Sequence, residues 1–249
     1  MRNALRFGLL AVVLVLVTWS GCNSDNNGTG SQETIIGSGV VAEEDRTVSG
    51  FTRVTLAAVG DVHITQGAVE SLRIQAEDNL MPHIRTAVRA GTLEITIDPG
   101  ITLQNTLPIE FHVSLISLDG LLLAGVGEID GLDLTVNQLS VTHSGVGSFD
   151  LVNLDAVGLD VVLSGVGDIR ISGTVGVQDV TLSGVGDYEA EDLQSTEADI
   201  VLSGLGSATV RVSDRLDVTI TSTGSVFYYG DPIVTISGSG TGTVQRLGP

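Results

Sequence analysis

The feature that most constrains the fold is a repeat that recurs about every 20 residues from about residue 120 onward. Each copy consists of a short apolar segment, a Ser-Gly-x-Gly motif or a variant of it, and a second apolar segment. The second glycine stands at positions 127, 147, 167, 186, 206, 224 and 240, so the spacing is 20, 20, 19, 20, 18 and 16 residues. A fixed period of this length is typical of solenoids, whose repeats stack on one another.

Apolar residues recur at fixed places around the motif and indicate which side chains face the core. In the copy that begins at Ser164, these residues are Val161, Leu163 and Ile169. Because residues two apart lie on one face of a strand, the pattern predicts strands with one buried face. The three columns are Leu121, Val141, Val161, Val180, Ile200, Val218 and Val234; Leu123, His143, Leu163, Leu182, Leu202, Ile220 and Ile236; and Ile129, Phe149, Ile169, Tyr188, Ala208 and Val226.

These columns predict an all-β chain whose residues 120–249 form a parallel β-solenoid. No single repeat can bury its own apolar face, so neighbouring repeats must cover it. Glycine suits the corner between the two strands of a repeat, because it accepts positive φ and close backbone approach.

A less regular β part is predicted at residues 37–119, where residues 54–64 fit the same columns. We expect it to continue the solenoid as one fold, with two independent domains as the alternative. The segment at 77–84 is predicted to be a turn or one helical turn, because Pro82 interrupts it. Further strand-like stretches lie at about 70–76, 84–89, 92–97 and 109–117.

Residues 1–21 are predicted to be a lipoprotein signal peptide. Arg2 and Arg6 precede an unbroken apolar run over 7–17, which as a helix would span about 17 Å, too short for a membrane core of about 30 Å. Ser20 and Gly21 then lead to Cys22, which resembles the lipid-attachment cysteine of bacterial lipoproteins, although Trp19 departs from the usual leucine-like residue. An ordinary secretory signal is the alternative. Residues 22–36 are predicted to be a flexible tether.

Composition excludes several kinds of partner. The formal net charge is −19 and all 11 basic residues are arginine, which argues against nucleic acid and against docking on anionic lipid. Cys22 is the single cysteine, so the chain can form neither an internal disulfide nor a zinc site built from several cysteines.

An ordered series of motifs resembles a known bacterial family, the auto-transporter adhesins with a head GIN domain. The resemblance covers nearly all of the chain after the tether and implies a β-solenoid-like fold, an envelope location and an adhesin role without a named receptor. It supplies no catalytic residues. The motifs are GSGVV (37–41), VSGFTRVTL (48–56), GDVHITQG (60–67), AEDNLMPHI (76–84), GTLEI (91–95), the SGVGD repeats and VFYYGDP (226–232).

Few residues in the sequence suggest site chemistry, and we expect no metal, no cofactor and no catalytic residue. His63, His83, His112 and His143 lack metal-ligand spacing, and His143 is predicted to be packed and hydrogen-bonded in its aliphatic column. The corner after the motif carries a column of polar residues that we interpret as solvated rather than as a calcium site, with Arg170 able to pair with Asp168. The column is Asp61, Glu128, Ser148, Asp168, Asp187, Ser207 and Ser225.

The aromatic cluster Phe227, Tyr228 and Tyr229 is predicted to cap the end of the solenoid, with Tyr228 facing inward. The alternative is that its exposed rings stack on sugars.

The sequence therefore predicts a lipid-anchored cell-envelope protein, in the outer membrane or at the cell surface. It would act as an adhesin or surface interaction module toward a cell-surface glycan or protein, with its oligomeric state left open. A structural envelope protein without a specific ligand is the alternative. A β-helix polysaccharide-degrading enzyme is less favoured, because such sites resemble clusters of Arg or Lys beside calcium carboxylates. The repeats hold only Arg170, Arg211, Arg215 and Arg246.

Overall fold

Nineteen strands and one three-residue 3₁₀ helix, η1 (Met81–His83), make up the part of the chain that the computed structural model describes, residues 32–249. Pro82 lies in the first turn of η1, so the predicted helical turn is confirmed. Within these residues, no helix has the length and apolar character needed to cross a bilayer. The predicted signal peptide, Cys22 and most of the predicted tether lie outside the described residues.

The strands of the first half are β1 (Glu33–Ile36), β2 (Val41–Arg46), β3 (Arg53–Leu56), β4 (Asp61–Gln66), β5 (Ser71–Glu77), β6 (Ile84–Arg89), β7 (Thr92–Ile97), β8 (Ile101–Gln104) and β9 (Glu110–Leu115). The strands of the second half are β10 (Gly120–Leu123), β11 (Val126–Leu132), β12 (Thr135–His143), β13 (Val146–Leu163), β14 (Ile169–Leu182), β15 (Tyr188–Leu202), β16 (Ser207–Ile220), β17 (Ser225–Tyr229), β18 (Ile233–Ser237) and β19 (Val244–Gly248).

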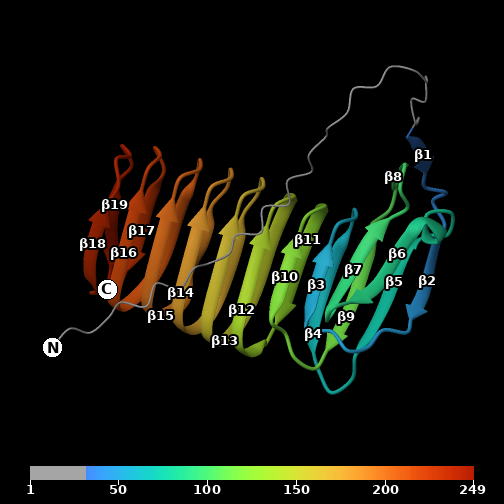
Figure 1. Ribbon diagram of the computed structural model, residues 1–249, viewed down its shortest axis with the longest axis horizontal. Coiled ribbons are helices and arrows are strands. Elements are labelled where there is room, and N and C mark those ends of the chain that lie inside the picture. Colours follow the sequence, from blue (N-terminus) through green and yellow to red (C-terminus); the bar gives the residue numbers. More distant parts are fainter. Residues whose placement is uncertain (1–31) are drawn as a thin grey trace. The chain divides into compact units, whose positions relative to one another are not determined.

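The repeats form a parallel stack in which each repeat pairs with the next (Figure 1). The register advances by one repeat at each step, so Val161 lies beside Val141 on one side and Val180 on the other. The stack is a β-solenoid of about 6 turns with a spacing of about 20 residues. The predicted all-β class and parallel solenoid are therefore confirmed. β13 to β16 are longer than predicted, because each continues around a bend that was expected to separate two short strands.

The first half of the described chain is built into the same stack. β3 pairs in parallel with β7 on one side and with β10 on the other. β4 likewise lies between β9 and β11. The segment from β3 to β4 is therefore inserted between two segments that follow it in the sequence. Within the described residues, the two predicted parts therefore share one stack of strands.

Antiparallel strands close the stack at the end formed by the first half, which the repeat pattern did not predict. β5 pairs antiparallel with β9 and with β2, and β6 pairs antiparallel with β7. Residues 33–36 were predicted to belong to the flexible tether, and this part of the prediction is wrong. They form β1, because their backbone groups pair in parallel with β8.

The core is a continuous set of apolar side chains from the predicted columns. Leu123, Leu163 and Leu202 are all buried, as are Phe149 and Tyr188 of the third column. The prediction fails at the last turn, where Ile236 was placed in the column of Ile220 but lies in register with Val218 and is 59% exposed. No later strand covers Ile236 within the described residues.

Candidate interaction surfaces

The glycine corners allow successive turns to touch through their backbones. Gly147 and Gly167 have φ values of +141° and +132°, a conformation that side chains disfavour. A Cβ atom on either residue would lie 1.7 Å from the carbonyl oxygen of the corresponding glycine in the preceding repeat. The sequence motif therefore reflects both the dihedral angle and the close approach.

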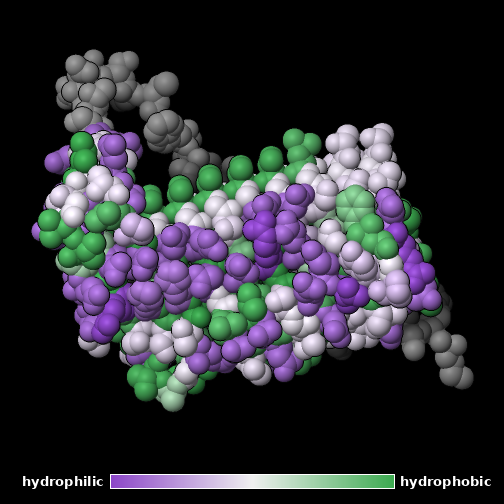
Figure 2. Space-filling model, turned by 180° about the vertical axis from the view of Figure 1, so that it is seen from behind, coloured by the Kyte–Doolittle hydropathy of each residue, from purple (hydrophilic) through white to green (hydrophobic). Residues whose placement is uncertain are grey.

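The variable residue of each motif points outward and forms an exposed row that we call the aliphatic ladder. Its members are in register, since Val166 forms β-bridges with Val146 and Val185. Their side chains are 48–61% exposed, and Figure 2 shows hydrophobic residues in a row along one edge. Adjacent members are about 4.8 Å apart along the stack, as for any pair of neighbouring strands. The aliphatic ladder consists of Val126, Val146, Val166, Val185 and Leu205.

A shallow groove of about 590 Å³ accompanies the aliphatic ladder over its last three members. Besides Val166, Val185 and Leu205, serine and glycine residues of the same motifs line it. The row thus has a hydroxyl-bearing flank on the side of the motif serines. The polar corner column, with its carboxylates, follows the motif on the other side.

The corner carboxylates have a role that sequence reasoning missed. An oxygen of Asp168 accepts a hydrogen bond from the backbone N–H of Asp187 at 2.9 Å, and Asp187 accepts one from Ser207 at 2.6 Å. Asp61 accepts one from Glu128 at 2.9 Å. These three aspartates were predicted to be merely solvated, but each accepts a hydrogen bond from the backbone of the next turn because the stack places that N–H beside it.

The charges around this column are only partly compensated. Burial, followed by the nearby Asp130 and Asp61, raises the pKa of Glu128 above its usual value. The predicted pair of Arg170 with Asp168 is present at 3.5 Å, but Arg170 lies closer to Glu189, at 2.6 Å. In residues 32–249, no group of three or more His, Cys, Asp or Glu side chains is arranged to hold a metal ion.

Neighbouring strands bring together histidines that are far apart in the sequence. The rings of His63 on β4 and His112 on β9 stack with centroids 4.9 Å apart. Nδ1 of His63 lies 2.6 Å from Asp130, and Nε2 of His112 lies 3.4 Å from Glu110. Only the register of β9, β4 and β11 reveals this cluster.

His143 is fully buried, and its Nε2 lies 2.9 Å from the carbonyl oxygen of Gly147. The predicted packed and hydrogen-bonded role is confirmed. Its ring also meets Phe149 edge-on, with centroids 5.9 Å apart. Nδ1 has no hydrogen-bond partner.

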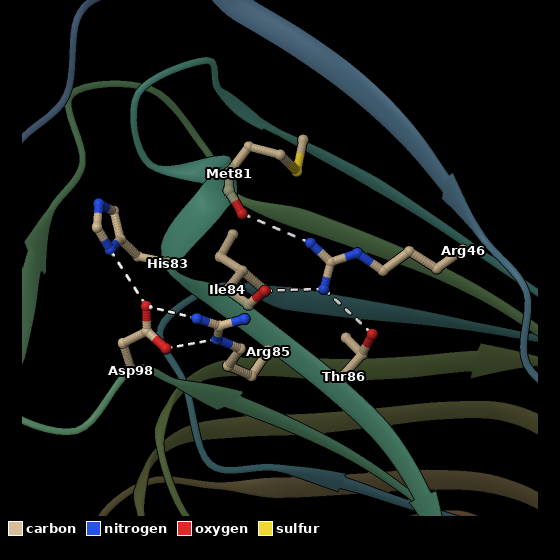
Figure 3. Close-up of polar contacts among 7 residues, drawn as sticks. All are labelled: Arg46, Met81, His83, Ile84, Arg85, Thr86 and Asp98. Atoms are coloured by element: carbon tan, nitrogen blue, oxygen red, sulfur yellow. Dashed lines mark hydrogen bonds and ion pairs between the residues drawn. The ribbon is translucent and has the colours of Figure 1, made fainter.

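A polar network fixes η1 and β6 at the closed end (Figure 3). The guanidinium of Arg46 donates to the carbonyl oxygen of Ile84 at 2.8 Å and to the Thr86 hydroxyl at 3.1 Å. Asp98 accepts hydrogen bonds from Arg85 and lies 3.3 Å from Nδ1 of His83. The Arg85 hydrogen bond holds the pKa of Asp98 below its usual value. The polar groups of this network bond to one another, and we therefore assign the network a structural role.

A second groove, of about 670 Å³, lies over β2, β5 and β9. Its charged side chains already pair with one another, since Arg73 lies 2.8 Å from Asp45. His112 lines the same groove. The groove offers mixed charges rather than one strong binding group.

The aromatic cluster does not form the end of the stack, so the end-cap prediction is wrong in detail. β17, which carries the cluster, pairs with β16 and with β19, and β19 lies beyond it. Tyr228 packs against the core, as predicted, and the guanidinium of Arg211 lies 4.7 Å from the ring centre of Tyr229.

Comparisons with known proteins agree with this architecture. A putative adhesin from Bacteroides fragilis NCTC 9343 is 28% identical with a TM-score of 0.82, and the match covers 86% of this chain and all of that one. A putative lipid binding protein from Parabacteroides distasonis ATCC 8503 is 21% identical (TM-score 0.66, 86% and 100% covered). A putative adhesin from Parabacteroides merdae ATCC 43184 is 18% identical (TM-score 0.64, 86% and 99% covered). The last two show the fold alone.

No curated protein matches the chain. The sequence model of one family, described as "Putative auto-transporter adhesin, head GIN domain", matches residues 50–232. This range includes β5 to β9 of the closed end, the aliphatic ladder and the aromatic cluster. The match confirms the resemblance that the motifs indicated, and the chain belongs to the auto-transporter adhesin family with a head GIN domain.

Proposed function

We propose that the protein is an adhesin-like interaction module of the cell envelope, held there by a lipid on Cys22, and that it acts by binding rather than by catalysis. Family membership supports the adhesin-like role. The observation that carries the proposal further is the aliphatic ladder, which we assign as the binding surface.

The aliphatic ladder has the physical properties of a preorganised contact surface. Aliphatic side chains exposed on five successive turns lose contact with water when a partner covers them. Valine has a single, stiff χ1 angle, so little side-chain entropy is lost on binding. The backbone beneath is fixed by the glycine corners.

The surroundings of the aliphatic ladder limit its ligand. The net charge of −19 disfavours an anionic partner. The hydroxyls of Ser164, Ser183 and Ser203 donate to backbone carbonyls of the preceding turn at 3.4 Å, so the serine flank offers hydroxyl oxygens that can accept hydrogen bonds. The row extends over several turns. The ligand is therefore an extended, uncharged or basic segment of a cell-surface glycan or protein, with apolar faces that meet the valines.

A triple substitution tests the surface. Val146→Thr, Val166→Thr and Val185→Thr together keep side-chain shape but add hydroxyl groups. If each valine contributes about 0.5 kcal/mol of apolar burial, binding should fall by roughly tenfold. The measurement is the binding of full-length protein to a glycan array and to intact cells, with the melting temperature recorded in parallel.

The matched control changes three exposed valines that lie outside the aliphatic ladder, Val152, Val157 and Val177. Their replacement by threonine should leave binding unchanged. Equal binding by the two triple variants, at equal melting temperatures, would show that the aliphatic ladder is not the binding surface.

The anchor has its own test. Cys22 follows the apolar run and two small residues, and acyl chains on it would each add about 0.8 kcal/mol of membrane affinity per buried methylene. Cys22→Ala should therefore release the protein from the membrane fraction or block its processing. Ser24→Ala is the control. Full membrane retention and normal size of the Cys22 variant would contradict lipid anchoring.

A further inference from the structure

The two ends of the stack differ in whether further elements cover the last strands. At the end formed by the first half, antiparallel strands and η1 cover the core, and Leu80, Met81 and Ile84 are buried there. At the other end, β18 pairs only with β16 and β19 only with β17 within residues 32–249. Figure 1 shows these two strands at the end of the series. Each therefore has one edge of backbone groups without a strand partner.

This open end, formed by β18 and β19, also exposes apolar side chains. Ile233 is 77% exposed, Ile236 is 59% exposed and Leu247 is 45% exposed. Ile236 lies in register with Val218, which follows Ile200 in the same inward column, and both of these residues are buried. Contact of these side chains with water is a cost that a covering partner would remove.

The charge at the open end distinguishes it from the rest of the molecule. Residues 218–249 contain one acidic and one basic side chain, Asp231 and Arg246, which lie 3.3 Å apart. Their side-chain charges sum to zero, whereas the whole chain carries −19. When two identical surfaces meet, each charge faces its own kind, so this neutral end can meet a second copy without that repulsion.

We propose that the open end binds the same end of a second copy. A two-fold axis would place β18 of one chain beside β18 of the other, antiparallel, so that the free edges complete each other's hydrogen bonds. The inward-facing Ile236 would be covered by the second copy, and Ile233, on the outer face of β18, would lie beside the partner strand. This inference is independent of the aliphatic ladder and of its ligand.

The assembly would stop at two copies. Growth of a fibre needs the open end of one copy to fit the closed end of the next, which is finished by antiparallel strands. β2, the outer strand there, carries Glu43, Glu44 and Asp45, and edge charges of this kind oppose further strand pairing. A closed dimer is thus the expected state.

Cysteine cross-linking of the full chain tests the geometry. Thr235 is the central residue of β18, so in an antiparallel pair related by a two-fold axis it lies near its own copy. Thr235→Cys should give a covalent dimer of twice the chain mass under mild oxidation, with Ser237→Cys covering a register displaced by two residues. Two controls account for contacts made by Cys22. They are Thr174→Cys, at an exposed position of β14 away from the open end, and the unchanged chain.

A disruptive variant gives the second measurement. Ile233→Glu combined with Leu247→Glu changes exposed residues and brings like charges together in the dimer. Sedimentation of the full chain in detergent at about 100 μM should show dimers for the original sequence and at least a tenfold weaker dimer for this variant, at an unchanged melting temperature.

Three results would overturn the proposal. These are a monomer at that concentration, cross-linking at Thr174 as efficient as at residues 235 and 237, and cross-linked products whose mass shows a different protein. The last result would identify the open end as a site for another protein's strand.

Discussion

Single side chains of this protein join segments that are distant in the sequence, and Glu77 is the best example. Its carboxylate is buried and accepts hydrogen bonds from the backbone N–H of Gly39 at 2.7 Å and from the backbone and hydroxyl of Thr106 at 2.9 and 2.5 Å. A Cβ atom at Gly37 would lie 2.0 Å from this carboxylate. Glu77 thereby joins the segments before β2 and after β8 to the end of β5.

The protonation of Glu77 should therefore control acid stability. The hydrogen bonds, first that of the Thr106 hydroxyl, lower the pKa of Glu77 to about 2, whereas an unfolded glutamate has a pKa of about 4.3. A lowered folded-state pKa gives stability that is full above about pH 4.3 and is lost as the pH falls toward 2. Glu77→Gln should be less stable at pH 6 and should lack this part of the pH dependence, as measured by urea unfolding.

Other carboxylates change the stability in the opposite direction as the pH falls, and their contribution must be separated from that of Glu77. Burial and neighbouring aspartates raise the pKa of Asp179 and Asp199, so their contribution becomes more favourable as the pH falls. The difference between the original chain and Glu77→Gln cancels this common contribution. Glu191→Gln, the same substitution on β15, serves as the control. Parallel profiles for the original chain and Glu77→Gln below pH 4.3 would refute the assigned role.

At the scale of the structural elements, the corner column shows how adjacent turns are linked. Asp168 and Asp187 lie on neighbouring turns, and one carboxylate oxygen of each accepts a hydrogen bond from a backbone N–H of the next turn. Serine replaces the carboxylate at positions 148 and 207, so the acidic series is interrupted. A structural calcium site needs six to eight oxygen ligands, more than this arrangement supplies.

We therefore predict that calcium has little effect on stability. Thermal melts of the protein in chelator and in millimolar calcium should have the same midpoint. A calcium site occupied at a hundred times its dissociation constant would add about 2.7 kcal/mol, which is readily measured. A rise of several degrees that disappears in Asp168→Asn with Asp187→Asn would instead establish a metal site in the corner column.

The strands of the repeats could be predicted from the sequence because each copy has the same register. Val161, Leu163 and Ile169 are buried as their columns required. The position of the corner carboxylates was predictable, but their backbone partners were not, because the N–H that each one binds belongs to the next turn. The cluster of His63 with Asp130 was not predicted for the same reason, because residues 67 positions apart in the sequence meet only through strand pairing.

Departures from the repeat were the least predictable part of the fold. β1 was missed because polar, turn-prone residues surround it, while its pairing with β8 depends on a segment almost 70 residues away. The strands of the closed end at 71–77, 84–89, 92–97 and 110–115 were predicted as strand-like stretches, but they carry no repeat motif from which their antiparallel pairing could be predicted. The exposure of Ile236 was not predicted, because the motif spacing placed it beside Ile220 whereas the strand register places it beside Val218 in the last turn.

At the scale of the whole molecule, the insertion of β3 and β4 between later segments makes the first half part of the stack. β3 touches both β7 and β10, and β4 touches both β9 and β11. Removing either half would uncover the apolar face of the other. The described residues should consequently unfold in one transition, which separates this arrangement from two independent domains.

A buried charge in one repeat tests this coupling. Val161 is 1% exposed and lies between Val141 and Val180, so Val161→Asp would place a carboxylate without a partner in the core, at a cost of several kcal/mol. Because a whole domain is stable by only about 5–15 kcal/mol, the melting temperature should fall sharply. Asp160→Ser, one residue away, loses only an exposed hydrogen bond to Gln138 and should melt nearly like the original chain.

Hydrogen exchange should show β3 and β4 losing protection together with β14 in Val161→Asp, because all three belong to one stack. Equal melting temperatures for the two variants would refute the column assignment, and a separate, unshifted transition for the first half would show that the stack unfolds in parts.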